Sequence, residues 1–327
     1  MKAVVTGGSG FIGAYLVRRL VTDGWRVSVI DNMVRGMPVR LQELANDIEV
    51  LQDDVRNTAT VTKACKNAEV IFHLAAVNGT DNFYKHPDLV LDVGLRGAIA
   101  VVEGGLAAGV PDLVFASSAE VYQTPSKIPT DESVPLMLPD SLNPRYSYGG
   151  SKIISELIAF NYGRDRFRRV QVFRPHNVYG PDMGWKHVIP QFILRFQELV
   201  KQHAFGRIPF HIQGDGSQTR AFCYVDDIVE GIMLMYEKGQ TRNVYHIGNP
   251  EMVSIAQLAD RVAKYFGREL ALVTDSAADG STAVRCPDIG KMHALGYAPK
   301  VPLNEGLRIT ADWYVSHGQA IPENALL

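Results

Sequence analysis

The chain has 327 residues, of which 46% are hydrophobic and 21% charged, and its formal net charge is −2. With 33 basic against 35 acidic residues it has the composition of an ordinary globular protein, which excludes a whole-chain basic surface for nucleic acid. Three cysteines without CxxC spacing favour a reducing, cytoplasmic setting, and no stretch approaches the roughly eighteen apolar residues of a membrane span.

Short apolar runs alternate with helical patterns along the first half of the chain. Strands are expected at Lys2–Thr6, Arg26–Ile30, Ile48–Leu51, Glu69–His73, Asp112–Ala116 and Arg169–Phe173. Helices are expected at Phe11–Thr22, Thr58–Cys65, Val90–Ala108 and Tyr148–Tyr162. This alternation is typical of an α/β fold with a doubly wound parallel sheet, covered by helices on both faces.

Beyond about residue 181 the pattern loosens. Its expected elements are a helix at Pro190–Gln202, a strand at Phe210–Gln213, a helix at Asp227–Glu237 and a terminal helix at Asn304–His317. We expect a first domain of residues 1–180 and a smaller mixed α/β region of residues 181–327, with part of the latter crossing back to the first domain. The Pro-rich segment Thr124–Pro144 is expected to form a long surface loop.

A glycine-rich motif, Val5-Thr-Gly-Gly-Ser-Gly-Phe-Ile-Gly13, joins the first strand to the first helix. Glycine suits a tight turn at Gly7, the approach of a pyrophosphate at Gly10, and close helix–strand packing at Gly13. The amino end of the helix then offers free N–H groups to phosphate. The motif in this context predicts a dinucleotide site on a Rossmann-type sheet.

Asp31 ends the second strand, eighteen residues beyond Gly13. An acid at this position binds both ribose hydroxyls and repels a 2′-phosphate, so NAD is predicted over NADP. Arg35 is the one nearby residue that would suit the phosphate of NADP.

The catalytic candidates are Tyr148, Lys152 and Ser118. Tyr148 and Lys152 are four residues apart and so share one helix face, where the ammonium group favours the phenolate and lowers its pKa. That phenolate can take a proton from a substrate hydroxyl while hydride leaves for NAD. Ser118 follows the fifth strand, at the sheet edge where such folds bind ligands.

Eight motifs occur in this order along nearly the whole chain: TGGSGFIG, Asp53-Asp-Val55, His73-Leu-Ala-Ala76, SSAEVY, YGGSK, Arg174-Pro-His-Asn-Val-Tyr-Gly-Pro181, Gly214-Asp-Gly-Ser-Gln-Thr-Arg220 and Tyr224-Val-Asp-Asp227. Together they resemble the extended short-chain dehydrogenase/reductase superfamily. Within it, the chain is similar to the NAD-dependent epimerase/dehydratase family of nucleotide-sugar enzymes, which includes sugar-nucleotide 4-epimerases and UDP-glucuronate decarboxylases.

The resemblance implies which residues bind the cofactor and which bind the substrate. NAD would be bound by residues 1–180, and a nucleotide-sugar substrate by residues 181–327. The implied cofactor contacts are Gly7, Gly10, Phe11, Ile12, Gly13, Asp31, Asn32, Asp54, Val55, Leu74, Ala75, Ala76, Tyr148 and Lys152. The implied substrate contacts are Ser118, Tyr148, Asn177, Val188, Arg220 and Arg285, with no metal ligands.

Two residues depart from the family pattern. Gly94 stands in the helix after the fourth strand, where the family usually has Asn. Gln123 stands where the family usually has Gly after Val-Tyr, and it is expected to alter the mouth of the site.

The reaction depends on Ser118-Ala119-Glu120. The resemblance implies that a 4-epimerase needs little beyond Ser, Tyr and Lys. A 4,6-dehydratase has an Asp acid and a Glu base in this segment, and a uronate decarboxylase has Thr-Ser-Glu. Glu120 matches the last two classes, but Ala119 cannot donate a proton. A 4-epimerase acting through a transient 4-keto intermediate is therefore favoured.

Three alternatives remain open at this point. A decarboxylase of the UDP-glucuronate type and a 4,6-dehydratase would both use Glu120 as a catalytic residue. A non-catalytic nucleotide- or nucleic-acid-binding relative would keep the fold without the chemistry.

The resemblance also implies a homodimer, in which two long helices of each subunit form the interface. The matching segments are Val90–Ala108 and Tyr148–Tyr162. The first carries an apolar stripe at helical spacing that would suit this interface or, equally, the sheet: Ile99, Val102, Leu106 and Val110.

Overall fold

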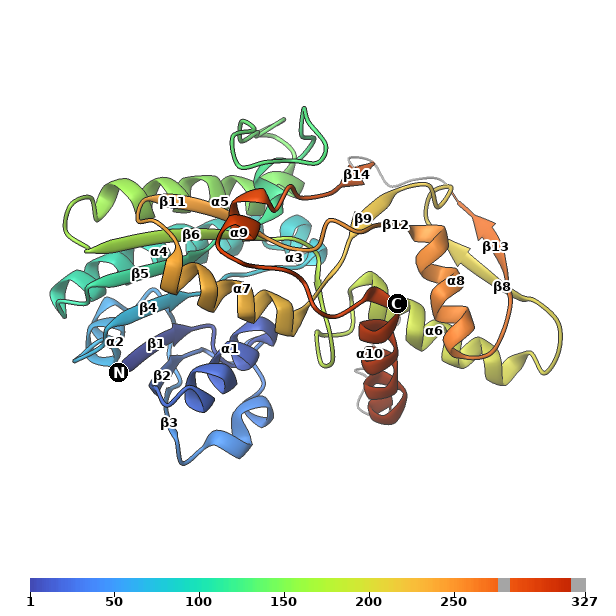
Figure 1. Cartoon of the computed structure of the whole chain (residues 1–327), viewed down its shortest axis with the longest axis horizontal. Helices are drawn as coiled ribbons and strands as arrows, with labels where there is room; N and C mark the ends of the chain where they lie inside the picture. Colours follow the sequence, from blue (N-terminus) through green and yellow to red (C-terminus); the bar gives the residue numbers. More distant parts are fainter. Residues whose placement is uncertain (276–282, 319–327) are drawn as a thin grey trace.

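The structure is a computed structural model that describes residues 1–275 and 283–318. Within these ranges, seven parallel strands form the central sheet in the order β11-β6-β5-β4-β1-β2-β3 (Figure 1). The strands are β1 (Lys2–Thr6), β2 (Arg26–Ile30), β3 (Ile48–Leu51), β4 (Val70–His73), β5 (Asp112–Ala116), β6 (Arg169–Pro175) and β11 (Asn243–Ile247). The predicted doubly wound α/β fold is confirmed.

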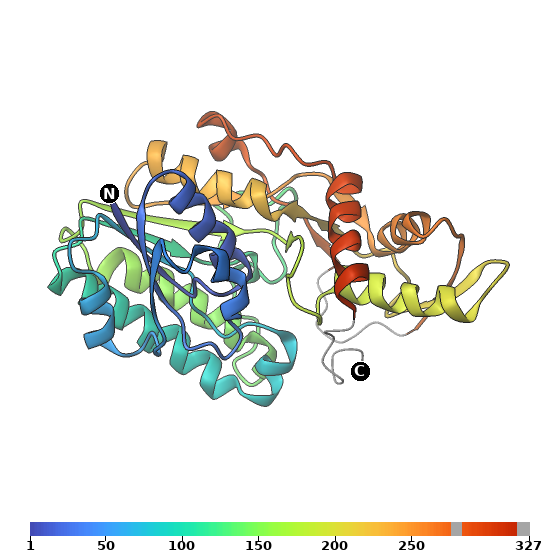
Figure 2. The same ribbon diagram turned by 90° about the horizontal axis from the view of Figure 1, so that it is seen from below.

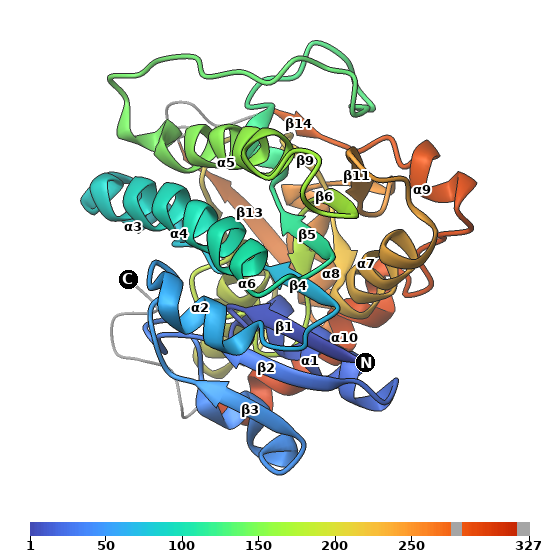
Figure 3. The same cartoon turned by 90° about the vertical axis from the view of Figure 1, so that its left-hand side faces the viewer.

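Helices cover both faces of this sheet (Figure 3). One face carries α1 (Phe11–Thr22) and α7 (Val225–Lys238). The other carries α2 (Thr58–Ala64), α4 (Pro87–Ala107) and α5 (Ser147–Leu157), and Figure 3 shows α4 and α5 side by side. The strand order reverses between β1 and β4, and ligands of such folds bind in the crevice at the carboxyl ends of these strands.

The sequence pattern explains why β1 lies at the centre. Its residues from Ala3 to Thr6 are all buried, as expected for a strand covered on both faces. Side chains alternate between faces, so Ala3 and Val5 join the core under α1 and α7, while Val4 joins the core under α2 and α4. Two separate apolar cores therefore hold the sheet in place.

The C-terminal region forms its own core beyond the sheet (Figure 2). Its helices are α6 (Val188–Gln202), α8 (Ile255–Tyr265) and α10 (Leu303–His317). Strand β8 (Ile208–Ile212) pairs with β13 (Leu270–Thr274), and β9 (Thr219–Ala221) lies between β12 (Met252–Ser254) and β14 (Val284–Arg285). From the same half of the chain, α7 and β11 return to the central sheet.

Several elements were absent from the sequence predictions. Strand β11 pairs with β6 along five residues, but the sequence pattern predicted no strand at Asn243–Ile247. Helix α8 begins at a capping box, in which Ser254 and Gln257 bond reciprocally. Helix α5 is shorter than predicted, because its last turn, Ile158–Tyr162, is a π-helix.

The Pro-rich segment runs over the surface from the short helix η2 (Ala119–Val121) to η3 (Pro144–Tyr146), at the top of Figure 1. It is attached to the C-terminal region at Thr130, whose backbone exchanges hydrogen bonds with Cys286 (2.8 Å) and Asp288 (2.7 Å). Among the described helices, none has the length and apolar character needed to cross a membrane.

Candidate active site

The turn after β1 has the geometry that a bound dinucleotide requires. Gly7 has a φ of +70°, and a Cβ on it would lie 2.8 Å from the Ala75 amide nitrogen. A Cβ on Gly13 would lie 2.1 Å from the Gly7 carbonyl oxygen, so α1 could not pack against the turn with any other residue. At Gly10, a Cβ would meet that oxygen at 3.1 Å.

The amino end of α1 is suited to an anion. Its N-cap, Gly10, has no side-chain capping bond, and its first turn, which starts at Phe11 and Ile12, carries no acidic residue. Backbone N–H groups and the positive end of the helix dipole are therefore available to a phosphate. The glycine turn and this helix end together fit the pyrophosphate of a dinucleotide.

Asp31 is buried at the carboxyl end of β2. Its carboxylate accepts hydrogen bonds from the backbone N–H groups of Ser9 (3.0 Å) and Met33 (2.9 Å). The acid is thus held next to the glycine turn, where it can bind ribose hydroxyls. Arg35 instead donates a hydrogen bond to the Asn78 carbonyl oxygen, in the loop before α3 (Thr80–Lys85).

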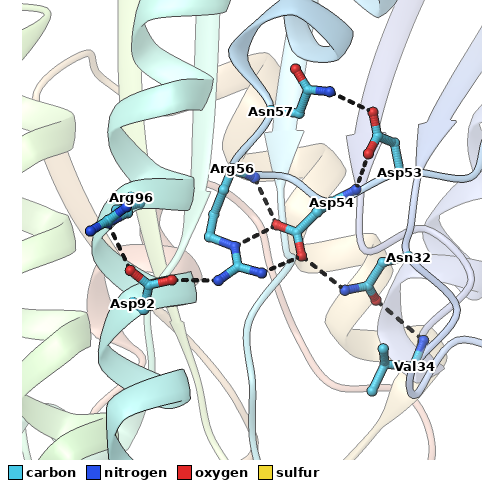
Figure 4. Close-up of polar contacts among 8 residues, drawn as sticks. All are labelled: Asn32, Val34, Asp53, Asp54, Arg56, Asn57, Asp92 and Arg96. Carbon is cyan, nitrogen blue, oxygen red and sulfur yellow. Dashed lines mark hydrogen bonds and ion pairs between the residues drawn. The ribbon is translucent and has the colours of Figure 1, made fainter.

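A polar network connects the predicted adenine contacts (Figure 4). Arg56 donates to both carboxylate oxygens of Asp54, each at 2.8 Å, and also bonds to Asp92 of α4. Asn32 donates to Asp54 at 3.2 Å. The hydrogen bonds from Arg56 lower the pKa of Asp54 to about 2, and the neighbouring Val55 is buried. The structure therefore brings Asn32, Asp54 and Val55 together.

The segment Leu74–Ala76 is attached directly to the glycine turn. The Leu74 amide donates to the Thr6 carbonyl oxygen at 3.1 Å, and the Ala75 amide donates to the Thr6 hydroxyl at 3.3 Å. That hydroxyl also bonds to Nδ1 of His73 at 2.7 Å. This segment lies beside the cradle for the pyrophosphate, as its predicted role requires.

Tyr148, Lys152 and Ser118 come together between α5 and the end of β5. Tyr148 is 8% exposed, and its ring stacks on Phe83 of α3 with 5.1 Å between the ring centres. Lys152 Nζ lies 5.7 Å from the centre of the Tyr148 ring and donates to the Ala116 carbonyl oxygen at 2.8 Å. Ser118 lies close enough to Tyr148 to lower the pKa of its phenol.

Burial changes the titration of the two helix residues in opposite directions. It raises the pKa of Tyr148 to about 12, although Ser118 opposes the rise. It lowers the pKa of Lys152 to about 8, although the charge of Glu156 opposes the fall. The helix spacing predicts that Lys152 lowers the Tyr148 pKa, but burial of the phenol is the larger effect.

Glu120 lies in a cluster of arginines. Its Oε1 is 2.6 Å from Arg285 Nη1, and its Oε2 is 3.8 Å from Arg145 Nη2. Arg220 lies opposite Arg285 in the β9–β14 pair. Burial alone would raise the pKa of Glu120, but the charges of Arg285, Arg145 and Arg220 outweigh burial, so this pKa is lowered.

Arg145 was not recognised from the sequence. It lies in η3, three residues before Tyr148, and its guanidinium also lies 5.8 Å from the centre of the Phe83 ring. Burial, with the repulsion of Arg285 and Arg145, lowers the pKa of Arg220 to about 10. A basic residue so close to the Tyr-x-x-x-Lys motif was the available signal for Arg145.

The remaining predicted substrate contacts lie on the C-terminal side. Asn177, in the turn between β6 and β7 (Val178–Tyr179), donates to the Ala221 carbonyl oxygen at 3.1 Å and so contacts the strand that carries Arg220. Val188 is the first residue of α6 and packs against the C-terminal core.

Both departures from the family pattern have a structural role. A Cβ on Gly94 would lie 2.9 Å from the Ser151 Cβ, so glycine permits the close contact of α4 with α5. Gln123 is buried with a φ of +50°, a conformation that favours glycine. Its amide donates to the Glu120 carbonyl oxygen at 2.6 Å, so it fixes the backbone of the acid beside it.

The chain is similar to known proteins of one family. The model of the NAD dependent epimerase/dehydratase family matches residues 3–248. UDP-glucuronic acid decarboxylase 6 of Arabidopsis thaliana is 32% identical over 321 residues, which are 94% of this chain and 87% of that protein. A putative UDP-glucose 4-epimerase of Methanocaldococcus jannaschii is 29% identical over 313 residues, which are 95% of this chain and 97% of that protein.

A solved structure agrees with these relatives. The dTDP-glucose 4,6-dehydratase of Streptomyces venezuelae, solved with NAD bound, superposes with a TM-score of 0.87 at 26% identity and covers 99% of this chain and 100% of its own. These three proteins are named for three different reactions, a decarboxylation, a putative 4-epimerisation and a 4,6-dehydration. This chain therefore belongs to the NAD-dependent epimerase/dehydratase family, and its cofactor is NAD.

Proposed function

We propose that this chain is a nucleotide-sugar 4-epimerase that acts through a transient 4-keto sugar. The observation that carries the proposal is the segment after β5, where Ala119 offers no acid and Glu120 is paired with Arg285. Because the pKa of Glu120 is lowered, its carboxylate stays ionised at neutral pH and cannot replace the missing acid. Its pairing with Arg285 and Arg145 also opposes a role as base, since a paired carboxylate accepts a proton less readily. Proton transfer is then left to Tyr148, and epimerisation requires no more than this.

Each of the three catalytic residues has one task in this mechanism. Tyr148 takes the proton of the C4 hydroxyl and later returns it, while Ser118 bonds to the same oxygen. Lys152 is largely protonated at pH 7 and stabilises the phenolate. Bound NAD supplies the hydride acceptor and donor, so no net NADH is formed. The stacking of Phe83 on Tyr148 fixes the plane of the phenol ring.

Uronate decarboxylation is the second candidate, supported by the arginine cluster. Arg145, Arg220 and Arg285 bring three positive charges to one carboxylate, Glu120. A carboxylate on the sugar would be a chemically suitable ligand for these guanidinium groups, because arginine pairs with carboxylates through two parallel bonds. The decarboxylase from Arabidopsis thaliana at 32% identity adds to this support.

The two candidates are separated by a panel of nucleotide-sugars with products identified by NMR, followed by two variants. Tyr148→Phe should slow either reaction by roughly 10²–10⁴, whereas Glu120→Gln keeps the shape of the side chain and removes its charge. An epimerase should lose much less activity in Glu120→Gln than in Tyr148→Phe, and Glu251→Gln, at an exposed glutamate paired with Arg261, is the matched control. Equal losses in the first two variants would overturn the epimerase and favour the lyase.

We also propose how the chain is divided between its ligands. Residues 1–180 would bind NAD and residues 181–327 the nucleotide-sugar, with α7 and β11 completing the first domain. Residues 276–282 and 319–327 of the second region lie outside the described residues. The described cysteines are buried free thiols, which supports the proposal of a reducing, cytoplasmic setting.

We propose a homodimer built on α4 and α5, although three of the four residues of the stripe that the sequence suggested lie in the core, and Ile99 is half-buried. Val102 and Val110 are buried against the sheet, and Leu106 packs beside them. The exposed apolar side chains of these two helices and of the turn after α5 are others, and these support the proposal: Leu89, Leu91, Ile154, Leu157 and Tyr162.

A further inference from the structure

A buried ion pair lies behind the catalytic residues. Glu156 of α5 and Arg174 of β6 are 5% and 3% exposed, and they form two hydrogen bonds, from Nε at 2.8 Å and from Nη2 at 2.6 Å. Burying two charges costs free energy that a well-packed apolar pair would not. The other hydrogen bonds of these two side chains indicate a role beyond stability.

Each member of the pair contacts one end of the same six-residue segment. The Ser117 hydroxyl donates to Glu156 Oε1 at 2.5 Å, and Arg174 Nη1 donates to the Tyr122 hydroxyl oxygen. Ser118 and Glu120 lie between these two ends. We call the four side chains of Ser117, Glu156, Arg174 and Tyr122 the brace.

The brace is completed on the far side by β11. Arg174 has no lone pair, so the Tyr122 oxygen accepts from it and the Tyr122 proton goes to Nε2 of His246, 2.6 Å away. Nδ1 of His246 then carries the ring proton and donates to the Asp288 carbonyl oxygen at 3.2 Å. This chain of bonds assigns the neutral tautomer of His246, whose pKa burial lowers to about 3.

The brace also reaches the helix that carries the other catalytic residues. Glu156 follows Lys152 by one helical turn, on the same face of α5. Lys152 bonds to the Ala116 carbonyl oxygen, directly before the segment that Glu156 holds through Ser117. The loop of Ser118 and the helix of Tyr148 are therefore joined twice within one helical turn.

We propose that Glu156 and Arg174 are positioning residues that hold Ser118 and Glu120 in register with Tyr148 and Lys152. The inference rests on the proposed function only for the roles of these catalytic side chains, and not for which product is released. Its first test therefore needs no substrate.

That test is hydrogen exchange measured by mass spectrometry on the whole protein. Ser117→Ala and Tyr122→Phe each remove one hydroxyl from the brace and leave the ion pair in place. The loss of a hydrogen bond to a charged group should speed exchange of the amides in residues 117–122 roughly tenfold or more. Ser155→Ala, a buried serine beside Glu156, and Tyr236→Phe, whose hydroxyl bonds Asp112 at 3.2 Å, are the matched controls. Unchanged exchange, or equal acceleration throughout the chain, would overturn the proposal.

The second test is the pH profile of turnover in Glu156→Gln. Tyr148 and Glu156 from α5 and His73 from β4 face Lys152, and His73 is neutral because burial lowers its pKa to about 3. Glu156 raises the pKa of Lys152, so the Gln variant should lose activity at a lower alkaline pH than the wild type. Tyr122→Phe keeps the charge and should reduce turnover without moving this limb. An unmoved limb in Glu156→Gln, with only a lower melting temperature, would show a merely structural pair. If the wild type converts no nucleotide-sugar, the proposed function fails, while hydrogen exchange still decides the brace.

Discussion

The two sides of the active site are built from different chemical groups. On the N-terminal side, the groups that fit a dinucleotide are largely backbone: the turn at Gly7, the packing at Gly13 and the free amino end of α1. On the C-terminal side, the groups proposed to bind the substrate include charged side chains, with Arg220 and Arg285 on adjacent strands. The N-terminal side is thus determined by the path of the backbone, and the C-terminal side by the identity of its side chains.

This difference teaches where specificity resides. Backbone N–H groups at a helix end bind a pyrophosphate whatever molecule carries it, so the N-terminal side can serve every reaction of the family. Arginine side chains can distinguish neutral from acidic sugars, because an unpaired buried charge is costly. Changes on the C-terminal side should therefore alter the choice of substrate while NAD binding is preserved.

The largest expected effect lies where the two sides meet, at Tyr148. Tyr148→Phe removes the group that takes the C4 proton while the ring can still stack on Phe83. Turnover should fall by roughly 10²–10⁴. Product formation on the substrate found in the nucleotide-sugar panel measures this fall.

NAD binding is the control for that variant, measured by quenching of protein fluorescence. Affinity for NAD within a few-fold of the wild type would confine the defect to chemistry. Turnover close to that of the wild type would remove Tyr148 from its assigned role.

A change confined to the cofactor side should act on affinity instead. Asp31→Ala removes the carboxylate expected to bind two ribose hydroxyls, and two charge-assisted bonds correspond to roughly a hundredfold in affinity. The Asp31 carboxylate also holds Ser9 and Met33, so the variant should lose some stability as well. Titration calorimetry with NAD measures the first effect, and Asp23→Ala, on the surface after α1, is the control. An NAD affinity equal to that of the wild type would contradict the role of Asp31.

The features that the sequence predicts are mostly those set by local backbone patterns, and the features that it misses depend on contacts between distant residues. The glycine turn, the first five strands and α1 were recognisable because local patterns determine them, and β1 shows its double burial as an unbroken apolar run. Strand β11 was missed because its place beside β6 depends on a pairing across about 70 residues of chain. Local periodicity carries no information about such a partner.

The catalytic residues were found, but their electrostatics were not. The spacing of Tyr148 and Lys152 shows that they share a helix face, whereas burial of the phenol arises from Phe83 on a different helix. Arg145 and the brace were missed for a related reason. Ser117, Glu156 and Arg174 are separated by up to 57 positions in sequence, and only the packing of α5 on the sheet brings them into contact.

The face formed by α4 and α5 offers a test on the N-terminal side that does not touch the site. Leu157 is 58% exposed, and a charge there would be buried in the proposed dimer without a partner. Leu157→Asp should weaken dimerisation at least tenfold, as measured by analytical ultracentrifugation across a micromolar concentration series. Val39→Asp, an exposed apolar residue in η1 (Pro38–Leu44), is the control. A wild-type protein that is monomeric throughout would dismiss the dimer.

The smallest expected effect concerns the Arg56 network, in which Arg56 connects Asp54 to Asp92 of α4 (Figure 4). Arg56→Met removes the partner of Asp54 and Asp92 while keeping much of the side-chain volume. The pKa of Asp54 is about 2 in the fold against 3.8 ordinarily, so its pairing stabilises the fold above pH 4 and is lost as the pH falls towards 2. Because these side chains are about a third exposed, the variant should lose only about 1 kcal/mol of unfolding free energy at pH 7.

Urea unfolding at a series of pH values measures this difference, and Arg261→Met, which removes a single surface pair with Glu251, is the control. The gap between wild type and Arg56→Met should be constant from pH 7 to about pH 4 and should close below it, because a protonated Asp54 gains little from Arg56. The control should differ from the wild type by less than about 0.5 kcal/mol at every pH. A gap that persists at pH 2 would mean that Arg56 contributes through packing of its stem, and the network would then owe little to charge.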